Sequence, residues 1–223
     1  MKIYLINYFK KALYLIVFTG LSLAHAGSYE DYFSAIKEGD ASTVQELLTR
    51  GFDANTPNPQ GLDGLHLALT EPSPKVAQVL IAWPRTDVNK LNPNGESPLM
   101  MASIKGYADL AQKLIDRGAD VNKTGWTPLH YAASSGQLGI IAMLIENSAY
   151  IDAESPNGTT PLMMAAMYGT SAAVKLLLEE GADPQLRNQQ GLTALQFAQR
   201  ANHQDAAEII AAAIRSKQPG GQW

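Results

Sequence analysis

The side chains that could perform acid–base or metal chemistry are few and widely separated. The chain of 223 residues contains four histidines and no cysteine, so thiol nucleophiles, disulfides and cysteine-based metal sites are excluded. His25, His66, His130 and His203 have no second histidine at a ligand spacing such as His-Glu-x-x-His. The spacing therefore predicts neither a zinc site nor a catalytic site built on these side chains.

Two short motifs, Asp53-Ala54-Asn55 and Asp120-Val121-Asn122, contain oxygen ligands that calcium prefers. They lack the third ligand, the glycine and the closing glutamate of a calcium loop, and Asp and Asn at such places commonly stabilise turns. The chain also lacks a Gly-x-Ser-x-Gly elbow and a phosphate-binding glycine-rich loop. We expect no metal, no cofactor and no enzymatic activity.

The charged residues are unevenly distributed along the chain. Residues 1–26 contain three lysines and no acidic residue, which leaves 14 basic and 21 acidic residues, a net charge of −7, for the rest. A surface with this charge repels phosphate backbones and has no basic stripe. We therefore exclude nucleic acids as partners.

Residues 1–26 have the layout of a secretory signal peptide. A basic start through Lys11 precedes a largely apolar run over residues 12–23, which ends in Ala24-His25-Ala26. Such a run is shorter than the roughly 20 residues of a membrane-spanning helix. We expect cleavage after this triplet and a periplasmic protein that is not attached to a membrane. The alternative is an uncleaved inner-membrane anchor, which would have to bury Lys10 and Lys11 in hydrocarbon.

Five segments of the chain share one pattern, in which a glycine is followed by a Thr-Pro-Leu-His-like string. They lie at 61–68, 95–102, 125–132, 158–165 and 191–198, and their leading glycines are 34, 30, 33 and 33 residues apart. A period near 33 residues predicts stacked helical hairpins that bury their apolar faces only against one another.

The best copies, Thr127-Pro128-Leu129-His130 and Thr160-Pro161-Leu162-Met163, resemble the ankyrin repeat. The resemblance covers roughly residues 29–214. It implies an all-α solenoid of about six stacked helix-turn-helix repeats with short β-hairpin or loop fingers. After the signal peptide (1–26) we expect a repeat domain over 27–215 and a flexible tail over 216–223, with repeats at approximately 29–57, 58–91, 92–123, 124–154, 155–187 and 188–215.

Each landmark of the repeat has a physical role. Thr127 and Thr160 are expected to cap the first helix of their repeats, and the following proline occupies a position where a missing N–H costs little. Gly51, Gly118 and Gly181 follow the second helices, where a left-handed residue ends a helix.

Two repeats depart from this pattern. The second repeat has no turn glycine but contains Pro72, Pro74 and Pro84, with Gly64 in place of the helix-starting proline, so we expect irregular structure there. The 30-residue interval before Gly125 indicates that the finger between Asn122 and Gly125 is three residues shorter than the others.

The resemblance also assigns roles to the histidines. It implies that His66 and His130, in the fourth position of the Thr-Pro-Leu-His string, are internal hydrogen-bonding struts. His203 stands alone before the last helix, and we expect it to be an ordinary surface residue.

In ankyrin repeat proteins, partners are contacted by the fingers and by the end of the first helix of each repeat, which line a concave groove. Transferred position by position, this implies a partner-binding set of Leu62, Glu96, Ile104, Lys105, Trp126, Ser134, Ser135, Thr159, Met167, Tyr168, Leu192 and Arg200. Half of these are apolar or aromatic, and a contiguous exposed apolar group would mark a binding patch. Two alternatives stay open: Met167 and Leu192 could pack as peripheral core, and the ring of Trp126 could fold over the short finger.

We therefore expect a monomeric, non-catalytic protein that holds another protein in this groove. One role is a periplasmic scaffold or accessory factor, since some exported bacterial ankyrin proteins are associated with stress protection. A second is an immunity or inhibitor protein that neutralises a secreted toxin, because a charge of −7 would steer a basic target. A third is a secreted effector that binds a host protein.

Overall fold

The computed structural model describes residues 27–71 and 73–217, which form α-helices joined by turns and loops, with no β-strand among them. The predicted signal peptide at 1–26 and the part of the predicted tail from residue 218 onward lie outside the described residues. The chain divides into two compact parts, an N-terminal module up to Arg85 and a C-terminal module from Thr86.

The N-terminal module contains the helix over residues 27–38, α2 (Ala41–Thr49), α3 (Gly64–Thr70) and α4 (Pro74–Ala82). α4 packs against both α2 and α3. The buried Tyr32 donates its hydroxyl to the Ala54 carbonyl at 3.2 Å, and burial raises the pKa of this phenol. A side chain at position 64 would collide with Tyr32, which explains why a glycine replaces the helix-starting proline there.

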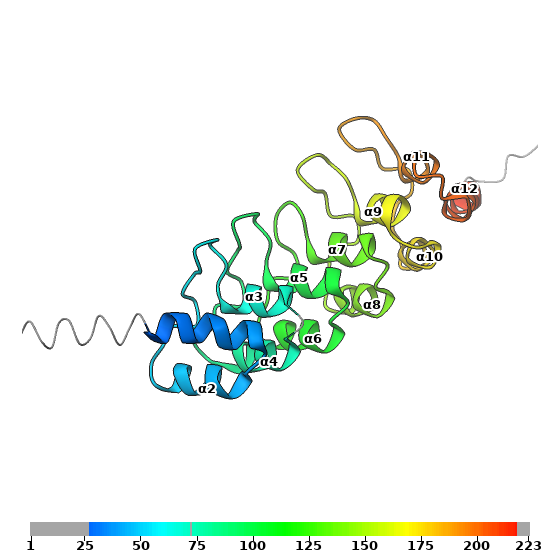
Figure 1. Cartoon of the computed structure of the whole chain (residues 1–223). Helices are drawn as coiled ribbons and strands as arrows, with labels where there is room; N and C mark the ends of the chain where they lie inside the picture. The colour runs from blue at the N-terminus through cyan, green and yellow to red at the C-terminus, as the bar shows by residue number, and fades with distance from the viewer. Residues whose placement is uncertain (1–26, 72, 218–223) are drawn as a thin grey trace, which may run out of the picture. The chain divides into compact units, whose positions relative to one another are not determined.

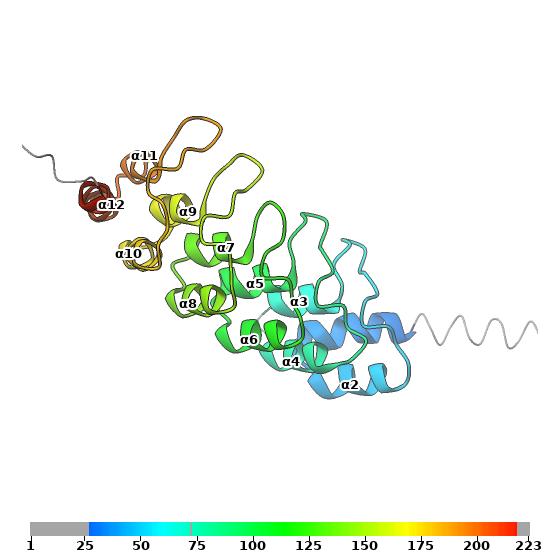
Figure 2. The same cartoon turned by 180° about the vertical axis from the view of Figure 1, so that it is seen from behind.

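The C-terminal module contains four successive helix pairs. They are α5 (Pro98–Lys105) with α6 (Ala108–Asp116), α7 (Pro128–Ser134) with α8 (Leu138–Glu146), α9 (Pro161–Tyr168) with α10 (Ser171–Glu179), and α11 (Ala194–Arg200) with α12 (Gln204–Lys217). The first helices of the pairs lie side by side, α5 on α7, α7 on α9 and α9 on α11, as Figures 1 and 2 show from opposite sides. α12 runs past the predicted domain end at residue 215.

The buried faces of these helices explain the packing. Small residues of the first helices, such as Ala132 and Ala166, are fully buried, and so are large aliphatic residues of the second helices, such as Ile141, Leu144 and Leu177. Small side chains let neighbouring first helices approach closely, while the aliphatic side chains fill the space beneath them. No described helix is both long enough and apolar enough to span a lipid bilayer.

The predicted helix starts are confirmed at Thr160, whose hydroxyl accepts from the Met163 backbone N–H at 3.4 Å. Thr127 occupies the N-cap position of α7, but its hydroxyl contacts the ring of His130 at 2.9 Å instead. The predicted helix ends are confirmed as well, because Gly51, Gly118 and Gly181 all have left-handed φ angles, of 101°, 84° and 104°.

The fingers of four repeats are closed by a pair of backbone hydrogen bonds. In the finger before α5, for example, the Asn92 N–H donates to the Glu96 carbonyl at 2.9 Å, and the Gly95 N–H donates to the Asn92 carbonyl at 2.8 Å. Equivalent pairs begin at Asn58, Ser155 and Asn188. Over 27–71 and 73–217, no such pair closes the finger between Asn122 and Trp126. The deletion has removed the residues that would form this turn.

A ladder of side-chain hydrogen bonds links successive repeats of the C-terminal module. The Asn89 amide donates to the Gly118 carbonyl at 3.0 Å and accepts from the Asp120 N–H at 2.8 Å. The Asn122 amide does the same one repeat later, with the Ser148 carbonyl at 2.7 Å and the Tyr150 N–H at 2.8 Å. Each asparagine therefore fixes the position of the following repeat.

Candidate functional site

The ends of the first helices in the C-terminal module bring most of the predicted contact residues to one edge. α5, α7, α9 and α11 pack in sequence order, so their C-terminal residues follow one another (Figure 1). We call this surface the first-helix edge; it consists of Ile104, Lys105, Ser134, Ser135, Met167, Tyr168 and Arg200.

Close contacts between consecutive turns hold this edge together. A Cβ atom at Gly106 would lie 2.7 Å from the Gln137 side chain, and one at Gly136 would lie 2.8 Å from Thr170. At Gly169 a Cβ atom would collide with the backbone carbonyl of Ala133. The turn glycines thus allow neighbouring repeats to approach at the place where the contact residues emerge.

The chemical character of the first-helix edge is apolar and basic. Tyr168 is 62% exposed and Ile104 is 40% exposed, and Lys105 and Arg200 are also exposed. Neither of these two cations has an ion pair or hydrogen bond among the residues that the structure describes. Met167 is half-buried, which supports its partial role in packing.

The two serines of this edge are less available. Ser134 and Ser135 each donate a hydroxyl to the Tyr131 carbonyl at 2.9 Å, and both are half-buried. Because both hydroxyl protons are donated to the Tyr131 carbonyl, the two serines could only accept hydrogen bonds from a partner, not donate them.

Two predicted contact residues are buried and are removed from the candidate surface. Thr159 is 2% exposed, and its carbonyl receives a hydrogen bond from His130. Leu192 is 9% exposed, and its N–H donates to the Asn188 side chain at 3.0 Å. Both follow a finger glycine, and the closing bonds of the finger turn these residues inward. Leu62 belongs to the N-terminal module and is half-buried, so it is not part of the first-helix edge.

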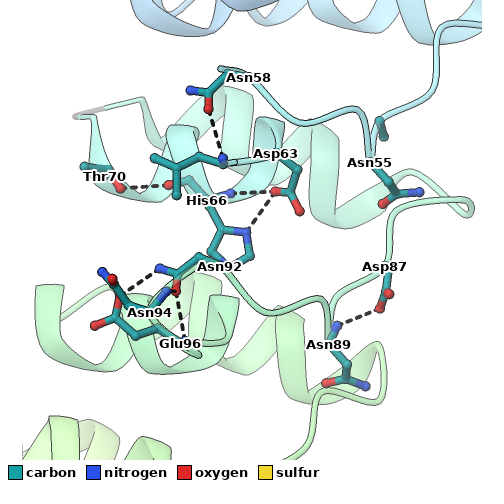
Figure 3. A network of polar contacts seen from close by, with 12 residues as sticks. Asn55, Asn58, Asp63, His66, Thr70, Asp87, Asn89, Asn92, Asn94 and Glu96 are labelled. Carbon is teal, nitrogen blue, oxygen red and sulfur yellow. Dashed lines mark hydrogen bonds and ion pairs between the residues drawn. The ribbon is translucent and has the colours of Figure 1, made fainter. Parts of the chain in front are cut away.

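Glu96 is tied into the protein rather than presented to a partner. One of its carboxylate oxygens accepts from the Asn92 amide at 2.7 Å and the other from the Tyr131 hydroxyl at 3.2 Å; Figure 3 shows the contact between Asn92 and Glu96. Burial and this carboxylate raise the pKa of Tyr131 to about 12. Glu96 therefore helps to position the finger.

Trp126 packs against the first helix of its own repeat. Its ring lies edge-on to the ring of His130, with 5.2 Å between centroids, and the residue is half-buried. A hollow of about 480 Å³, lined among others by Thr124, Gly125 and Arg187, lies at the short finger, but Trp126 is not among its lining residues. A contact of Trp126 with a partner therefore stays a prediction.

The histidines occupy structural positions. Nε2 of His130 lies 2.9 Å from the Thr159 carbonyl, and Nδ1 lies 3.2 Å from the Thr127 backbone nitrogen, as expected for an internal strut. In the N-terminal module, Nδ1 of His66 lies 2.9 Å from the carboxylate of the buried Asp63, which also caps α3 (Figure 3).

The prediction for His203 is wrong. This residue is half-buried, and its Nδ1 lies 3.1 Å from the Ala166 carbonyl at the end of α9. It occupies the position that Thr170 and Gln137 hold in the preceding repeats, directly before the second helix. The alignment of His203 with Gln137 and Thr170 in the repeat could have predicted this structural role from the sequence. Over the described ranges, no group of three or more His, Cys, Asp or Glu side chains could hold a metal ion.

Comparison with known proteins agrees with this architecture. A family model described as ankyrin repeats in three copies matches residues 32–123, 65–155 and 148–218 of the chain. Neurogenic locus notch homolog protein 1 of Xenopus tropicalis is 31% identical over 124 residues, which are 54% of this chain and 5% of that protein. Palmitoyltransferase AKR1 of Lachancea kluyveri is 29% identical over 130 residues, 56% of this chain and 18% of that protein. The chain thus spans a small part of these relatives.

A solved structure matches a larger part of the chain. It is a chain from the complex of a predatory endopeptidase of Bdellovibrio bacteriovorus with an immunity protein. The two chains are 28% identical with a TM-score of 0.70, and the match covers 82% of this chain and 97% of that one.

Proposed function

Because the chain belongs to the ankyrin repeat family, we propose that it is a non-catalytic module that binds another protein through the first-helix edge. The observation that carries this proposal is the exposure of Tyr168 and Ile104 on the same edge as Lys105 and Arg200, two cations without an ion pair or hydrogen bond within the described part of the chain. Large exposed apolar side chains are not needed to hold the repeats together, and aromatic and Arg residues often supply most of the energy of a protein interface.

We further propose that the protein acts after export to the periplasm, as a scaffold or accessory factor that contributes to stress protection. The leader at residues 1–26 supports export, and a chain without cysteine cannot form wrong disulfides in an oxidising compartment. Sequencing the N-terminus of the protein recovered from the producing cells tests export. A first residue of Gly27 is expected, whereas an intact Met1 would favour an uncleaved anchor.

A second candidate role is that of an inhibitor or immunity protein for a secreted enzyme. The likeness to a chain from an endopeptidase–immunity protein complex favours it, and so does the charge of −7 outside the leader, which would attract a basic enzyme. Salt separates the roles. Capture steered by a charge of −7 slows steeply between low and physiological salt, whereas docking on the first-helix edge, with its exposed apolar side chains and only two cations, depends less on salt. A secreted effector with a host partner is the third possibility.

The experiment that tests the binding edge compares two exposed apolar side chains. The full chain is expressed with a C-terminal tag in the producing organism, and proteins retained by wild type, Tyr168→Asn and Leu91→Asn are identified and quantified. Leu91 is 44% exposed and lies directly before the finger of its repeat, outside the first-helix edge. A partner that is lost only with Tyr168→Asn supports the edge. Equal recovery with wild type and Tyr168→Asn would place the binding surface elsewhere.

A further inference from the structure

The hydrogen-bonded ladder of the C-terminal module places three residues in one row. The side chain of Asn89 binds the N–H of Asp120, that of Asn122 binds the N–H of Tyr150, and the Asp152 carboxylate accepts from the Asp183 N–H at 3.1 Å. Asp120, Tyr150 and Asp183 therefore hold equivalent positions in successive repeats. We call them the ladder row.

Tyr150 occupies a position that other repeats give to a turn-forming aspartate. Asp53, Asp87 and Asp183 each accept a hydrogen bond from the backbone N–H two residues later, at 3.0, 2.9 and 2.9 Å. Tyrosine cannot make this bond, and the ring of Tyr150 is 69% exposed. This side chain therefore gives folding no turn bond and leaves most of its ring available for recognition.

The helix ends beside the ladder row carry acidic residues against the helix dipole. The last residues of α6, α8 and α10 are Asp116, Glu146 and Glu179, and Glu180 caps α10. The C-terminal end of a helix is already partially negative, so an acidic residue there is unfavourable and a basic one is expected. α8 and α10 have no basic residue in the last turn, and the nearby Lys175 is paired with Glu179 at 3.7 Å. α6 differs, because it has Lys113 in its last turn and Arg117 at its C-cap. Tyr150 thus follows a helix, α8, that ends in an acidic residue with no basic residue in its last turn.

We propose that the ladder row is a second docking surface, and that its occupant is a basic, extended segment of a partner protein. Tyr150 offers an aromatic face to an Arg or Lys side chain, while Asp120 and Asp183 on either side attract further cations. Phosphate-bearing partners and a second copy of this acidic chain are disfavoured by the same charges. This surface is independent of the first-helix edge.

The spacing of the row suggests the form of the segment. Neighbouring packed helices lie about 8–10 Å apart, so adjacent members of the row are separated by about that distance. A polyproline II segment advances about 9 Å in three residues and presents every third side chain on one face. A segment with a basic residue at every third position therefore matches the row.

The test uses a synthetic peptide, Arg-Pro-Pro-Arg-Pro-Pro-Arg, labelled with a fluorophore and titrated with the full chain at low salt. Two peptides of equal length, with Gln or Glu in place of each Arg, serve as references. We expect the Arg peptide to bind and the Gln and Glu peptides to bind at least about tenfold more weakly. Tyr150→Asn restores a turn-forming side chain without adding charge, and we expect it to weaken binding about two- to fivefold.

A matched pair of double variants separates the row from the overall charge. Asp120→Asn/Asp183→Asn removes two charges from the row, and Asp109→Asn/Asp205→Asn removes two from the first turns of α6 and α12. Only the first pair should weaken binding, and adding Tyr150→Asn to it should bring the loss to about tenfold. Equal losses from both pairs, or no binding of the Arg peptide by wild type, would overturn the proposal. Melting temperatures near that of wild type verify that the variants are folded.

Discussion

The buried His130 should make the stability of the protein fall as the pH falls. Its Nδ1 accepts from the Thr127 N–H, so the neutral ring carries its proton on Nε2, which donates to the Thr159 carbonyl. The side chain is fully buried. Burial, partly offset by the hydrogen bond to Thr159, lowers its pKa from 6.5 to about 4. Protonation of Nδ1 would also remove the acceptor for Thr127.

The sign and size of the effect follow from these values. Between about pH 6.5 and pH 4 the unfolded chain binds a proton at His130 that the folded chain does not, so folding is increasingly opposed as the pH falls. The contribution is fully present above pH 6.5 and is lost as the pH approaches 4. Because one pKa unit corresponds to about 1.4 kcal/mol, the lowered pKa of His130 corresponds to about 3 kcal/mol of unfolding free energy.

The assay compares wild type with His130→Gln by urea unfolding at several pH values from 7.5 to 4. Gln suits this purpose because Gln196, at the same position of α11, accepts from the Thr193 N–H at 2.9 Å. The titration of all other groups largely cancels in the difference between the two proteins. The advantage of wild type over the variant should shrink by about 3 kcal/mol across this range. A difference that stays constant with pH would refute the reasoning.

Three further substitutions test the repeat architecture by the same unfolding assay. Gly118→Val places a β-branched residue at a φ of 84° and should cost about 1–2 kcal/mol; an unchanged midpoint would contradict the left-handed helix end. Asp152→Asn supplies a donor for the Gly181 carbonyl, as the ladder asparagines do in other repeats, and should add about 1 kcal/mol. A loss would mean that the carboxylate is the better ladder residue. Gly169→Ala would collide with the Ala133 carbonyl and should cost about 1–3 kcal/mol; wild-type stability would show that this turn can shift freely.

The sequence predicts those features of the fold that depend on local chemistry. A threonine before a proline marks a helix start, and a glycine after an aliphatic run marks a helix end, because both roles are decided within a few residues. Thr160 and Gly181 accordingly lie where they were expected. The short finger is also local, because the deletion before Gly125 removes the residues that close the turn elsewhere.

Features that depend on contacts between repeats could not be predicted in this way. Thr159 and Leu192 occupy finger positions that the family resemblance assigns to partners, but the finger bonds and His130 bury them. His203 lacks any partner nearby in sequence and finds one 37 residues away, at Ala166. Ser148 takes the left-handed position that glycine fills in other repeats, at a φ of 65°. A search of the sequence for helix-ending glycines therefore misses the helix end at Ser148.

Repetition within one chain separates structural from functional residues, because each repeat is a control for the others. At the fourth position of the helix-starting string, His130, Met163 and Gln196 all accept from the backbone N–H of the residue before the helix. Three different side chains therefore make the same structural hydrogen bond. Tyr150 differs from its counterparts without keeping their hydrogen bond, and Tyr168 stands exposed where Ser135 folds back on its own helix. A contribution to stability explains the residues at the fourth position of the string, but it does not explain Tyr150 and Tyr168. Both rings are largely exposed, Tyr150 at 69% and Tyr168 at 62%, so replacing these tyrosines should change binding more than folding.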